Sequence, residues 1–249
     1  MIYRATAHML EAALRLRAKA GGSDALRQRL ALDAPGPADI WFHGASVGEL
    51  TSARPIMEAL ARTHRVLVTA NSVTGRDMAA GWGMEARLAP LDLPGALARF
   101  LAQVAPRLQV TVESEFWPLR SQALADRGIA QAVIGARLSQ RSASRWARLP
   151  ALIGQVLGRL AALSAQDPDS EARLRSLGLP DGAVLPRLDL KLLTPAGIAP
   201  SEPSEARDRV LLAASTHEGE EAHVLDACQQ ARRHVPDLRL ILAIRHPQR

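Results

Sequence analysis

The sequence predicts an α/β protein with doubly wound parallel sheets. From Ile40 onward, short apolar runs alternate with helical patterns, and candidate strands recur roughly every 21 to 30 residues, the length of a βαβ unit. Runs such as VLVTA and LILAI are apolar almost throughout, as strands covered on both faces must be. We expect strands to begin near Ile40, Arg65, Ala86, Leu108, Ala130, Leu160, Ala183, Arg209 and Leu238.

The composition narrows the class of protein. A chain of 249 residues with 47% hydrophobic residues is not a disordered chain. The formal net charge is +6, and two of the 31 basic residues are lysines, which leaves 29 arginines, the side chain suited to gripping phosphate or carboxylate. The arginines are dispersed and aromatic residues make up 3%, so nucleic-acid binding is disfavoured. Cys228 is the one cysteine, so no intrachain disulfide forms, no zinc-type Cys/His spacing occurs, and a cytoplasmic location is the default.

The N-terminal segment, residues 1–35, predicts a helix over residues 2–20. It is amphipathic, with Ile2, Met9, Ala13 and Leu16 on one side and basic residues at the edges. Such a helix either lies on an anionic membrane surface or packs on the domain with its basic face in solvent. No run reaches the roughly 18 apolar residues that a spanning helix needs.

The stretch Ile40 to Leu50, IWFHGASVGEL, predicts a buried strand, a turn and the start of a helix. Glu49 stands at the mouth of this turn, where open α/β sheets bind ligands, and is the first candidate for a catalytic carboxylate. The alternative is structural, since Ser46 and Glu49 also have the spacing of a capping box. Spacing does not choose between the two.

A linker is expected at residues 194–205, TPAGIAPSEPSE, which ends a first domain at residues 36–202. A second domain, residues 203–249, then shows strand, helix and strand. Two strands and one helix are too little for a stable α/β domain. We therefore expect the chain to be a fragment of a longer protein.

Seven stretches fall at the expected carboxyl ends of strands, where ligands bind. They are HGASVGE (43–49), NSVTGRD (71–77), LDLPGA (91–96), ESEFWP (113–118), GARLS (135–139), STHEGEE (215–221) and RHPQR (245–249). In this order they resemble the 3-deoxy-D-manno-octulosonic acid (Kdo) transferases, whose motifs are similar to HxASVGE, TxTG, DLPG, ETELWP, NARLS, GSTHEGEE and PRHPER. The resemblance runs from about Ile40 to the last residue.

The resemblance implies a GT-B architecture of two Rossmann-like domains, the first for the acceptor and the second mainly for the CMP-sugar. It implies inverting transfer of Kdo from CMP-Kdo to the lipid A precursor, with no cofactor and no assigned metal. It further implies a peripheral protein on the cytoplasmic face of the inner membrane, held by the anionic surface. The oligomeric state is not indicated.

By position in the motifs, the resemblance makes Glu49 the general base. Glu115 becomes a transition-state stabiliser or site organiser, the alternative being an acid at a strand end held by a nearby arginine. Trp117 and its neighbours in FWP are interpreted as packing and turn geometry. The implied acceptor-binding residues are His43, Ser46, Thr74, Gly75 and Arg137.

On the second domain, the resemblance makes STHE and the arginine of RHPQR the donor side. Arg245 would face the CMP phosphate or the Kdo carboxylate. An alternative for the first stretch is again structural, a capping box formed by Ser215 and Glu218. The implied donor-binding residues are Ser215, Thr216, His217, Glu218 and Arg245.

Some positions depart from the family pattern. A GNLKFD-like segment corresponds here to PRLDLKL (186–192), which puts Asp189 at the family's lysine and Lys191 at its aspartate. A local two-residue shift would let Lys191 serve in catalysis. Gly135 replaces the asparagine before ARLS. The alternatives are a GT-B glycosyltransferase that uses another nucleotide sugar, or a non-catalytic module that binds a sugar phosphate or a membrane surface.

Overall fold

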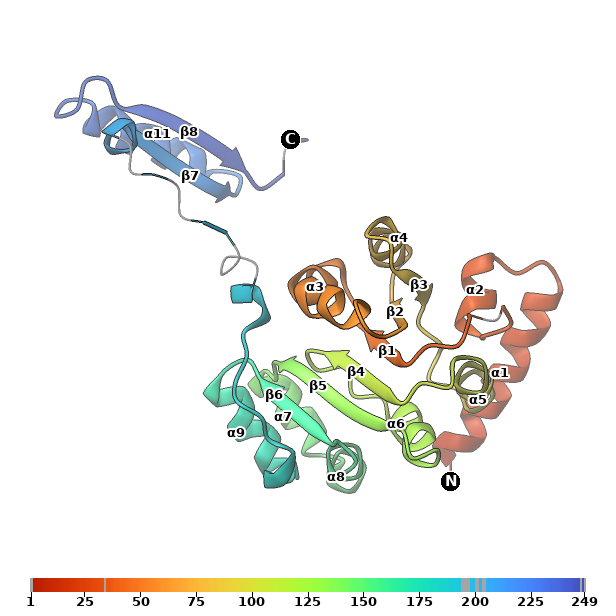
Figure 1. Cartoon of the computed structure of the whole chain (residues 1–249). Helices are drawn as coiled ribbons and strands as arrows, with labels where there is room; N and C mark the ends of the chain where they lie inside the picture. The colour runs from red at the N-terminus through yellow and green to blue at the C-terminus, as the bar shows by residue number, and fades with distance from the viewer. Residues whose placement is uncertain are drawn as a thin grey trace. The chain divides into compact units, whose positions relative to one another are not determined.

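The computed structural model describes residues 2–33, 35–193, 198–199, 202, 205–246 and 248. The chain forms two compact units, Met1–Ile198 and Ala199–Arg249. Most of the predicted linker lies outside the described residues. Figure 1 shows the helices and strands of each unit.

The first unit is built on a six-stranded parallel sheet in the order β3-β2-β1-β4-β5-β6. This is the strand order of a doubly wound dinucleotide-type fold, so the predicted fold class is confirmed. The order reverses between β1 and β4, which makes their carboxyl ends the expected ligand site. The strands are β1 Ile40–His43, β2 Val66–Ala70, β3 Glu85–Leu88, β4 Leu108–Val112, β5 Ala130–Ala136 and β6 Ala162–Ala165.

Helices cover both faces of this sheet. On one face Phe42 packs with Met57 of α3, while on the other Trp41 packs with Phe100 of α5. All four residues of β1 are buried because successive side chains point to opposite covered faces. The helices that follow β1 are α3 Val47–Ala61, α4 Val73–Gly81, α5 Pro94–Val104, α6 Pro118–Ala125, α7 Gln140–Trp146, α8 Pro150–Gly158 and α9 Pro168–Ser176.

The N-terminal helices, α1 Ile2–Lys19 and α2 Asp24–Arg29, belong to the first unit. The apolar side predicted for α1 does not pack on the domain at Met9 and Leu16, which are 75% and 69% exposed. The buried side instead carries Glu11, whose carboxylate accepts a hydrogen bond of 2.7 Å from Gly95 N and pairs with Arg99 at 2.8 Å. A polar contact with α5 thus sets the rotation of α1. No helix within the described part of the chain is long and apolar enough to cross a membrane.

One predicted strand, near Ala183, is absent. A short 3₁₀ helix, η1 Asp181–Ala183, occupies this position, and pairing is limited to one isolated bridge between Leu163 and Val184. The turn-forming residues of Pro180-Asp181-Gly182 explain why the extended segment does not begin there.

The second unit contains a short 3₁₀ helix, η3 Glu205–Arg209, followed by β7 Val210–Thr216, α11 Glu220–Ala231 and β8 Arg239–Ile244. Its two strands are parallel, which confirms the predicted βαβ arrangement. Both faces of the pair retain exposed apolar side chains, with Leu212 at 61% and Ile241 at 49% on one face and Leu211 at 36% and Leu242 at 37% on the other.

Candidate active site

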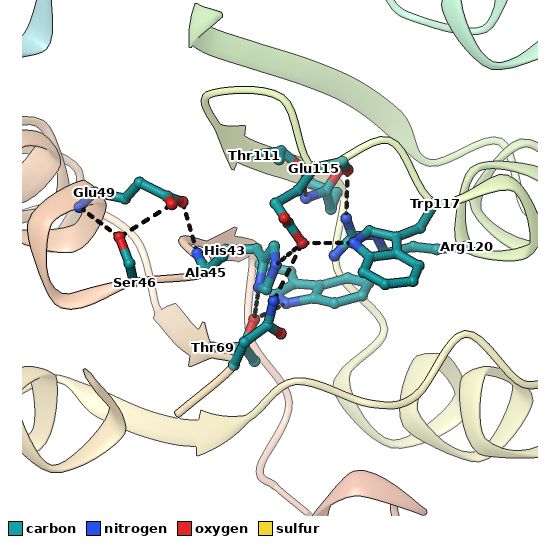
Figure 2. Close-up of polar contacts among 12 residues, drawn as sticks. His43, Ala45, Ser46, Glu49, Thr69, Thr111, Glu115, Trp117 and Arg120 are labelled. Carbon is teal, nitrogen blue, oxygen red and sulfur yellow. Dashed lines mark hydrogen bonds and ion pairs between the residues drawn. The ribbon is translucent and has the colours of Figure 1, made fainter. Parts of the chain in front are cut away.

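Three loops meet at the carboxyl edge of the six-stranded sheet. His43 ends β1, Asn71 follows β2, and the loop 113–117 follows β4. Because β1 lies between β2 and β4, these loops are neighbours. Their polar groups converge around the carboxylate of Glu115 (Figure 2).

Glu49 lies in the first turn of α3, whose N-cap is Ser46. The hydroxyl of Ser46 accepts from Glu49 N at 3.2 Å and donates to Glu49 Oε1 at 3.0 Å. The other carboxylate oxygen, Oε2, accepts from Ala45 N at 2.7 Å (Figure 2). The capping interpretation is therefore confirmed for Ser46, and Glu49 remains partly exposed.

Burial raises the pKa of Glu49, although the bonds from Ala45 and Ser46 oppose it. The charges of Glu113 and Glu115 raise the pKa further, so both carboxylates of the β4 loop act on it. Glu113 adopts a left-handed backbone with φ of 58°, and its N–H donates to Ile134 O at 3.0 Å. Such strain in a non-glycine residue is concentrated at functional sites.

Glu115 is held ionised by donors on three sides. Its Oε2 accepts from Trp117 Nε1 at 2.7 Å and from Asn71 Nδ2 at 3.2 Å, and His43 Nε2 lies 3.9 Å away. The interaction with His43 and the bond from Trp117 lower the pKa of Glu115 to about 2 against the opposing effect of burial. Glu115 is thus a carboxylate at any neutral pH, whereas the pKa of Glu49 is raised.

The position of Arg120 is at odds with the interpretation that a nearby arginine holds the Glu115 carboxylate. The arginine does not bind the carboxylate; it donates to the backbone oxygen of Glu115 at 2.7 Å. Its guanidinium also lies 5.7 Å from the ring centre of Trp41. Burial lowers the pKa of Arg120 to about 10, which leaves it protonated at neutral pH. Its positive charge acts on Glu115 at a distance and fixes the loop that carries it.

The ring of His43 is enclosed at the end of β1. Its side chain has no exposed surface, so the predicted direct contact with an acceptor is wrong. Trp41 Nε1 can only donate, and it donates to Thr69 Oγ1 at 2.7 Å. The hydroxyl proton of Thr69 is then available for His43 Nδ1, 2.9 Å away.

When the Thr69 hydroxyl donates to Nδ1, the ring proton of His43 lies on Nε2, which is 3.9 Å from Glu115 Oε2. Burial, with the nearby charge of Arg120, lowers the pKa of His43 to about 4, so the ring is neutral at pH 7. Nε2 has no hydrogen-bond partner among the described residues. In the tautomer with the proton on Nε2, the N–H group lies near the Glu115 carboxylate and favours its charged form.

The remaining acceptor candidates lie at two neighbouring loops. Gly75 is buried at the start of α4, where a Cβ would lie 3.1 Å from that of Ala70, so it serves packing; Thr74 beside it is exposed. Arg137 is exposed, and its backbone oxygen accepts a hydrogen bond from Ser114 in the Glu115 loop.

Lys191 lies in the short 3₁₀ helix η2, Leu190–Leu192, which contacts α3. Its side chain is exposed, and its N–H donates to Asp189 Oδ1 at 3.0 Å. Leu190 packs against Gly135, whose φ of 60° and missing side chain create the space: a Cβ there would lie 2.7 Å from Leu190 Cδ1. Two departures from the family pattern are thus in contact.

In the second unit, the predicted capping box of Ser215 and Glu218 is wrong. Helix α11 begins at Glu220 with Gly219 as its N-cap, and Glu220 Oε2 accepts from His217 N at 2.7 Å. The glycine, at φ of 92°, lets the chain turn before the helix starts.

The donor candidates lie at the ends of β7 and β8. Ser215, at φ of 61°, His217 and Glu218 are exposed. Thr216 is buried and donates to Glu221 Oε1 at 2.6 Å, so its side chain is part of the fold. Arg245 N donates to Thr216 O at 3.0 Å, which brings the two stretches together, with the Arg245 side chain exposed.

Several site residues were missed by sequence reasoning: Trp41, Thr69, Asn71, Glu113, Trp117 as a donor, and Arg120. Asn71 and Glu113 stood within stretches that the motifs had marked. Thr69 and Trp41 carried no signal, because they lie inside ordinary apolar strand patterns. Within the described ranges, no group of three or more His, Cys, Asp or Glu residues is placed to hold a metal ion.

Comparison with protein families gives one decisive match. The profile of the family described as 3-Deoxy-D-manno-octulosonic-acid transferase (kdotransferase) matches residues 23–194. The chain belongs to this family. Among curated proteins, it is 31% identical over 244 residues to the 3-deoxy-D-manno-octulosonic acid transferase of Haemophilus influenzae, covering 90% of this chain and 57% of the relative. It is 34% identical over 231 residues to that of Bordetella pertussis, covering 87% and 54%.

This Kdo transferase family chain spans about half the length of those curated relatives. Among solved structures, UDP-GlcNAc 2-epimerase from Neisseria meningitidis bound to UDP-GlcNAc has a TM-score of 0.57 at 16% identity, covering 82% of this chain and 64% of that one. A second UDP-N-acetylglucosamine 2-epimerase has a TM-score of 0.54 at 11% identity, covering 83% and 61%. These likenesses concern the fold alone, which is of GT-B type.

Proposed function

We propose that the protein containing this chain transfers Kdo from CMP-Kdo to the lipid A precursor, with inversion at the anomeric carbon. The observation that carries the proposal is the contrast between two carboxylates at the switch point of the sheet. Burial raises the pKa of Glu49, whereas donors lower that of Glu115 to about 2. Environments that separate the pKa values of neighbouring groups are typical of divided acid–base and electrostatic roles.

In the proposed reaction, Glu49 takes the proton of the attacking acceptor hydroxyl. The acceptor oxygen forms a bond to the anomeric carbon of Kdo as the bond from that carbon to the phosphate oxygen of CMP breaks. CMP leaves with the electron pair of the broken bond, and the proton remains on Glu49. The transition state has positive charge at the sugar, and the fixed negative charge of Glu115 stabilises it.

The polar side chains at the ends of β7 and β8 supply the donor contacts in this proposal. Arg245 is exposed and forms no ion pair with a described residue, so its guanidinium is available to an anionic donor group. His217 and Glu218 flank it on the adjoining loop. Lys191, exposed on η2 beside α3, is a candidate for transition-state charge stabilisation.

The proposed place of action is the cytoplasmic face of the inner membrane, where the protein binds peripherally. The net charge of +6 supports attraction to an anionic lipid surface. The acceptor side would be formed by the exposed loops that carry Ser46, Thr74 and Arg137.

The experiment is a CMP-Kdo transfer assay on the complete protein with the lipid A precursor as acceptor. Glu49→Gln should lower kcat by about a hundredfold to ten-thousandfold, the usual worth of a general base. The control is Glu58→Gln on the same helix, whose carboxylate pairs with Arg54 on the surface. A Glu49→Gln enzyme at the wild-type rate overturns the base assignment, and heat protection by UDP instead of CMP overturns the donor.

A further inference from the structure

A second polar pocket lies beside the Glu115 site. It has a volume of about 200 Å³ and is lined by Arg29, Asn71, Asp92, Trp117 and Arg120, together with the apolar Ala89, Pro90 and Leu91. Two of these residues form its common wall with the active site, since Asn71 Nδ2 and Trp117 Nε1 both donate to Glu115 Oε2. Whatever occupies the pocket therefore touches the groups that hold Glu115.

The charges around the pocket favour an anion. Both oxygens of Asp92 are engaged by the start of α6, accepting from Leu119 N at 3.1 Å and Arg120 N at 2.6 Å. Arg120 is buried and remains charged. Arg29 forms no ion pair with any described residue. Asp92 is the one carboxylate of the lining, so the two guanidinium groups of Arg29 and Arg120 leave the lining with a net positive charge.

Arg29 is also held in place. Its side chain donates to the backbone oxygen of Asn71, and its own carbonyl accepts from Leu91 N at 2.9 Å. These bonds clamp the end of α2 between the loops after β2 and β3. A guanidinium whose position is fixed in advance loses less entropy when it binds an anion.

Trp117 adds a surface for the rest of the ligand. Its indole is 40% exposed although its N–H is already satisfied by Glu115, so the ring offers a flat apolar face to the pocket. A guanidinium beside an aromatic face suits a charged phosphate on a carbohydrate ring. The volume exceeds what a phosphate alone would fill.

We propose that this pocket binds a phosphate monoester carried on a sugar, with Arg29 gripping the phosphate and Trp117 covering the sugar ring. The inference rests on the proposed function, in which the ligand is part of the acceptor. A bound phosphosugar would contact Asn71 and Trp117, the two residues that donate hydrogen bonds to Glu115 Oε2. Binding in the pocket would therefore restrict the position of the carboxylate proposed to stabilise the transition state.

The test uses the 249-residue chain with its four tryptophans labelled with ¹⁵N, so that each indole N–H gives one NMR signal. Glucosamine 6-phosphate should shift the Trp117 signal saturably, and glucosamine should not. Arg29→Gln should weaken the binding by about tenfold or more, because a charge-assisted contact is lost. Arg29→Lys should retain part of it. The signals of Trp82 and Trp146 report whether each variant is folded.

Arg27→Gln is the matched control, since Arg27 lies on the same helix but pairs with Asp33 outside the pocket lining. The proposed phosphosugar site is overturned if Arg29→Gln binds glucosamine 6-phosphate as tightly as the wild type does. It is also overturned if glucosamine binds as tightly as glucosamine 6-phosphate. Micelles of a phosphorylated glucosamine lipid, compared with the dephosphorylated lipid, distinguish a lipid headgroup from a free sugar phosphate. Binding of the soluble compound without the lipid removes the acceptor assignment and keeps the pocket.

This readout needs no donor and no turnover. A complete protein that fails to transfer Kdo while its Trp117 signal still responds to the phosphosugar would contradict the proposed function alone. Transfer that is unaffected by Arg29→Gln would contradict the pocket alone.

Discussion

The indole nitrogen of Trp117 donates a hydrogen bond of 2.7 Å to Oε2 of Glu115, two residues earlier in the chain. Trp117 is thus part of the electrostatic site, and its interpretation as a packing residue alone is wrong. The bond joins the ring that lines the phosphosugar pocket to the carboxylate proposed to stabilise the transition state.

Trp117→Phe keeps an aromatic ring and removes the donor. The pKa of Glu115 should rise by about one unit or more, because a hydrogen bond to a carboxylate favours its charged form. Carboxylate ¹³C NMR titration measures this change directly. Trp82→Phe is the control, since its ring lies under Arg54. An unaltered Glu115 titration in Trp117→Phe would mean that the bond does not act on the charge.

Ser46→Ala separates the two roles found at the start of α3. Loss of the N-cap should cost about 1 kcal/mol of unfolding free energy, measured by urea denaturation. It should also raise the pKa of Glu49, because the bond from Ser46 lowers it. The acid limb of the transfer rate should then move to higher pH, since a base must be deprotonated to act.

Ser139→Ala provides the comparison for Ser46→Ala, because Ser139 caps α7 in the same way. It should cost similar stability and leave the rate profile in place. If both variants shift the acid limb equally, the effect comes from general loss of stability, and Ser46 has no specific influence on Glu49.

His43→Gln should alter how stability depends on pH. The pKa of His43 is about 4 in the folded protein and near 6.5 when unfolded. Below pH 6.5 the unfolded state takes up a proton that the folded state does not, so stability is lost as pH falls from 6.5 towards 4. This loss is at most about 3 kcal/mol.

Urea denaturation at pH 7, 5.5 and 4.5 measures this dependence. The loss should be smaller in His43→Gln than in the wild type, and His64→Gln, at an exposed histidine, should resemble the wild type. Glu115 makes a separate contribution to stability, which is lost as the pH falls from 4.5 to about 2. Parallel curves for wild type and His43→Gln would show that burial of His43 does not set the dependence.

Gly135→Ala should destabilise the first unit by more than backbone strain alone. Gly128, at φ of 65°, has open space where a Cβ would lie, so Gly128→Ala measures the strain, about 1 kcal/mol. Gly135→Ala adds the overlap with Leu190, and its unfolding free energy should fall by a further 1 kcal/mol or more, roughly.

Leu190→Ala should remove most of that additional cost when combined with Gly135→Ala. A double-mutant cycle from denaturant curves measures the coupling between the two residues. Additive effects of the two substitutions would indicate that Leu190 moves aside without cost.

The fold was predictable because its signal is local. Continuous apolar strands separated by helical patterns predicted a parallel sheet, and eight of the nine predicted strands occur. The exception near Ala183 and the rotation of α1 were not predictable, since one depends on a turn and the other on the contact of Glu11 with α5. In both cases the structure is determined by features that the local pattern of apolar residues does not include.

The site was predictable only in part. Motif positions placed Glu49 and Glu115 on adjacent loops, but spacing could not tell that His43 is buried behind Glu115 or that Arg120 binds a backbone oxygen instead of the carboxylate. Which partner a side chain finds depends on the packing of strands that are distant in the chain.

By itself the sequence determined the α/β class, the order of its elements and the family to which the chain belongs. The tertiary structure alone decided which atoms meet. Asn71 and Glu115 are 44 positions apart, and their bond exists because β1 holds the ends of β2 and β4 at one edge of the sheet. Arg29 is 42 positions from Asn71 and reaches it from the end of α2. Burial at that edge then lowers the pKa of His43 and raises that of Glu49, and burial is a property of the packed protein that no spacing of residues encodes.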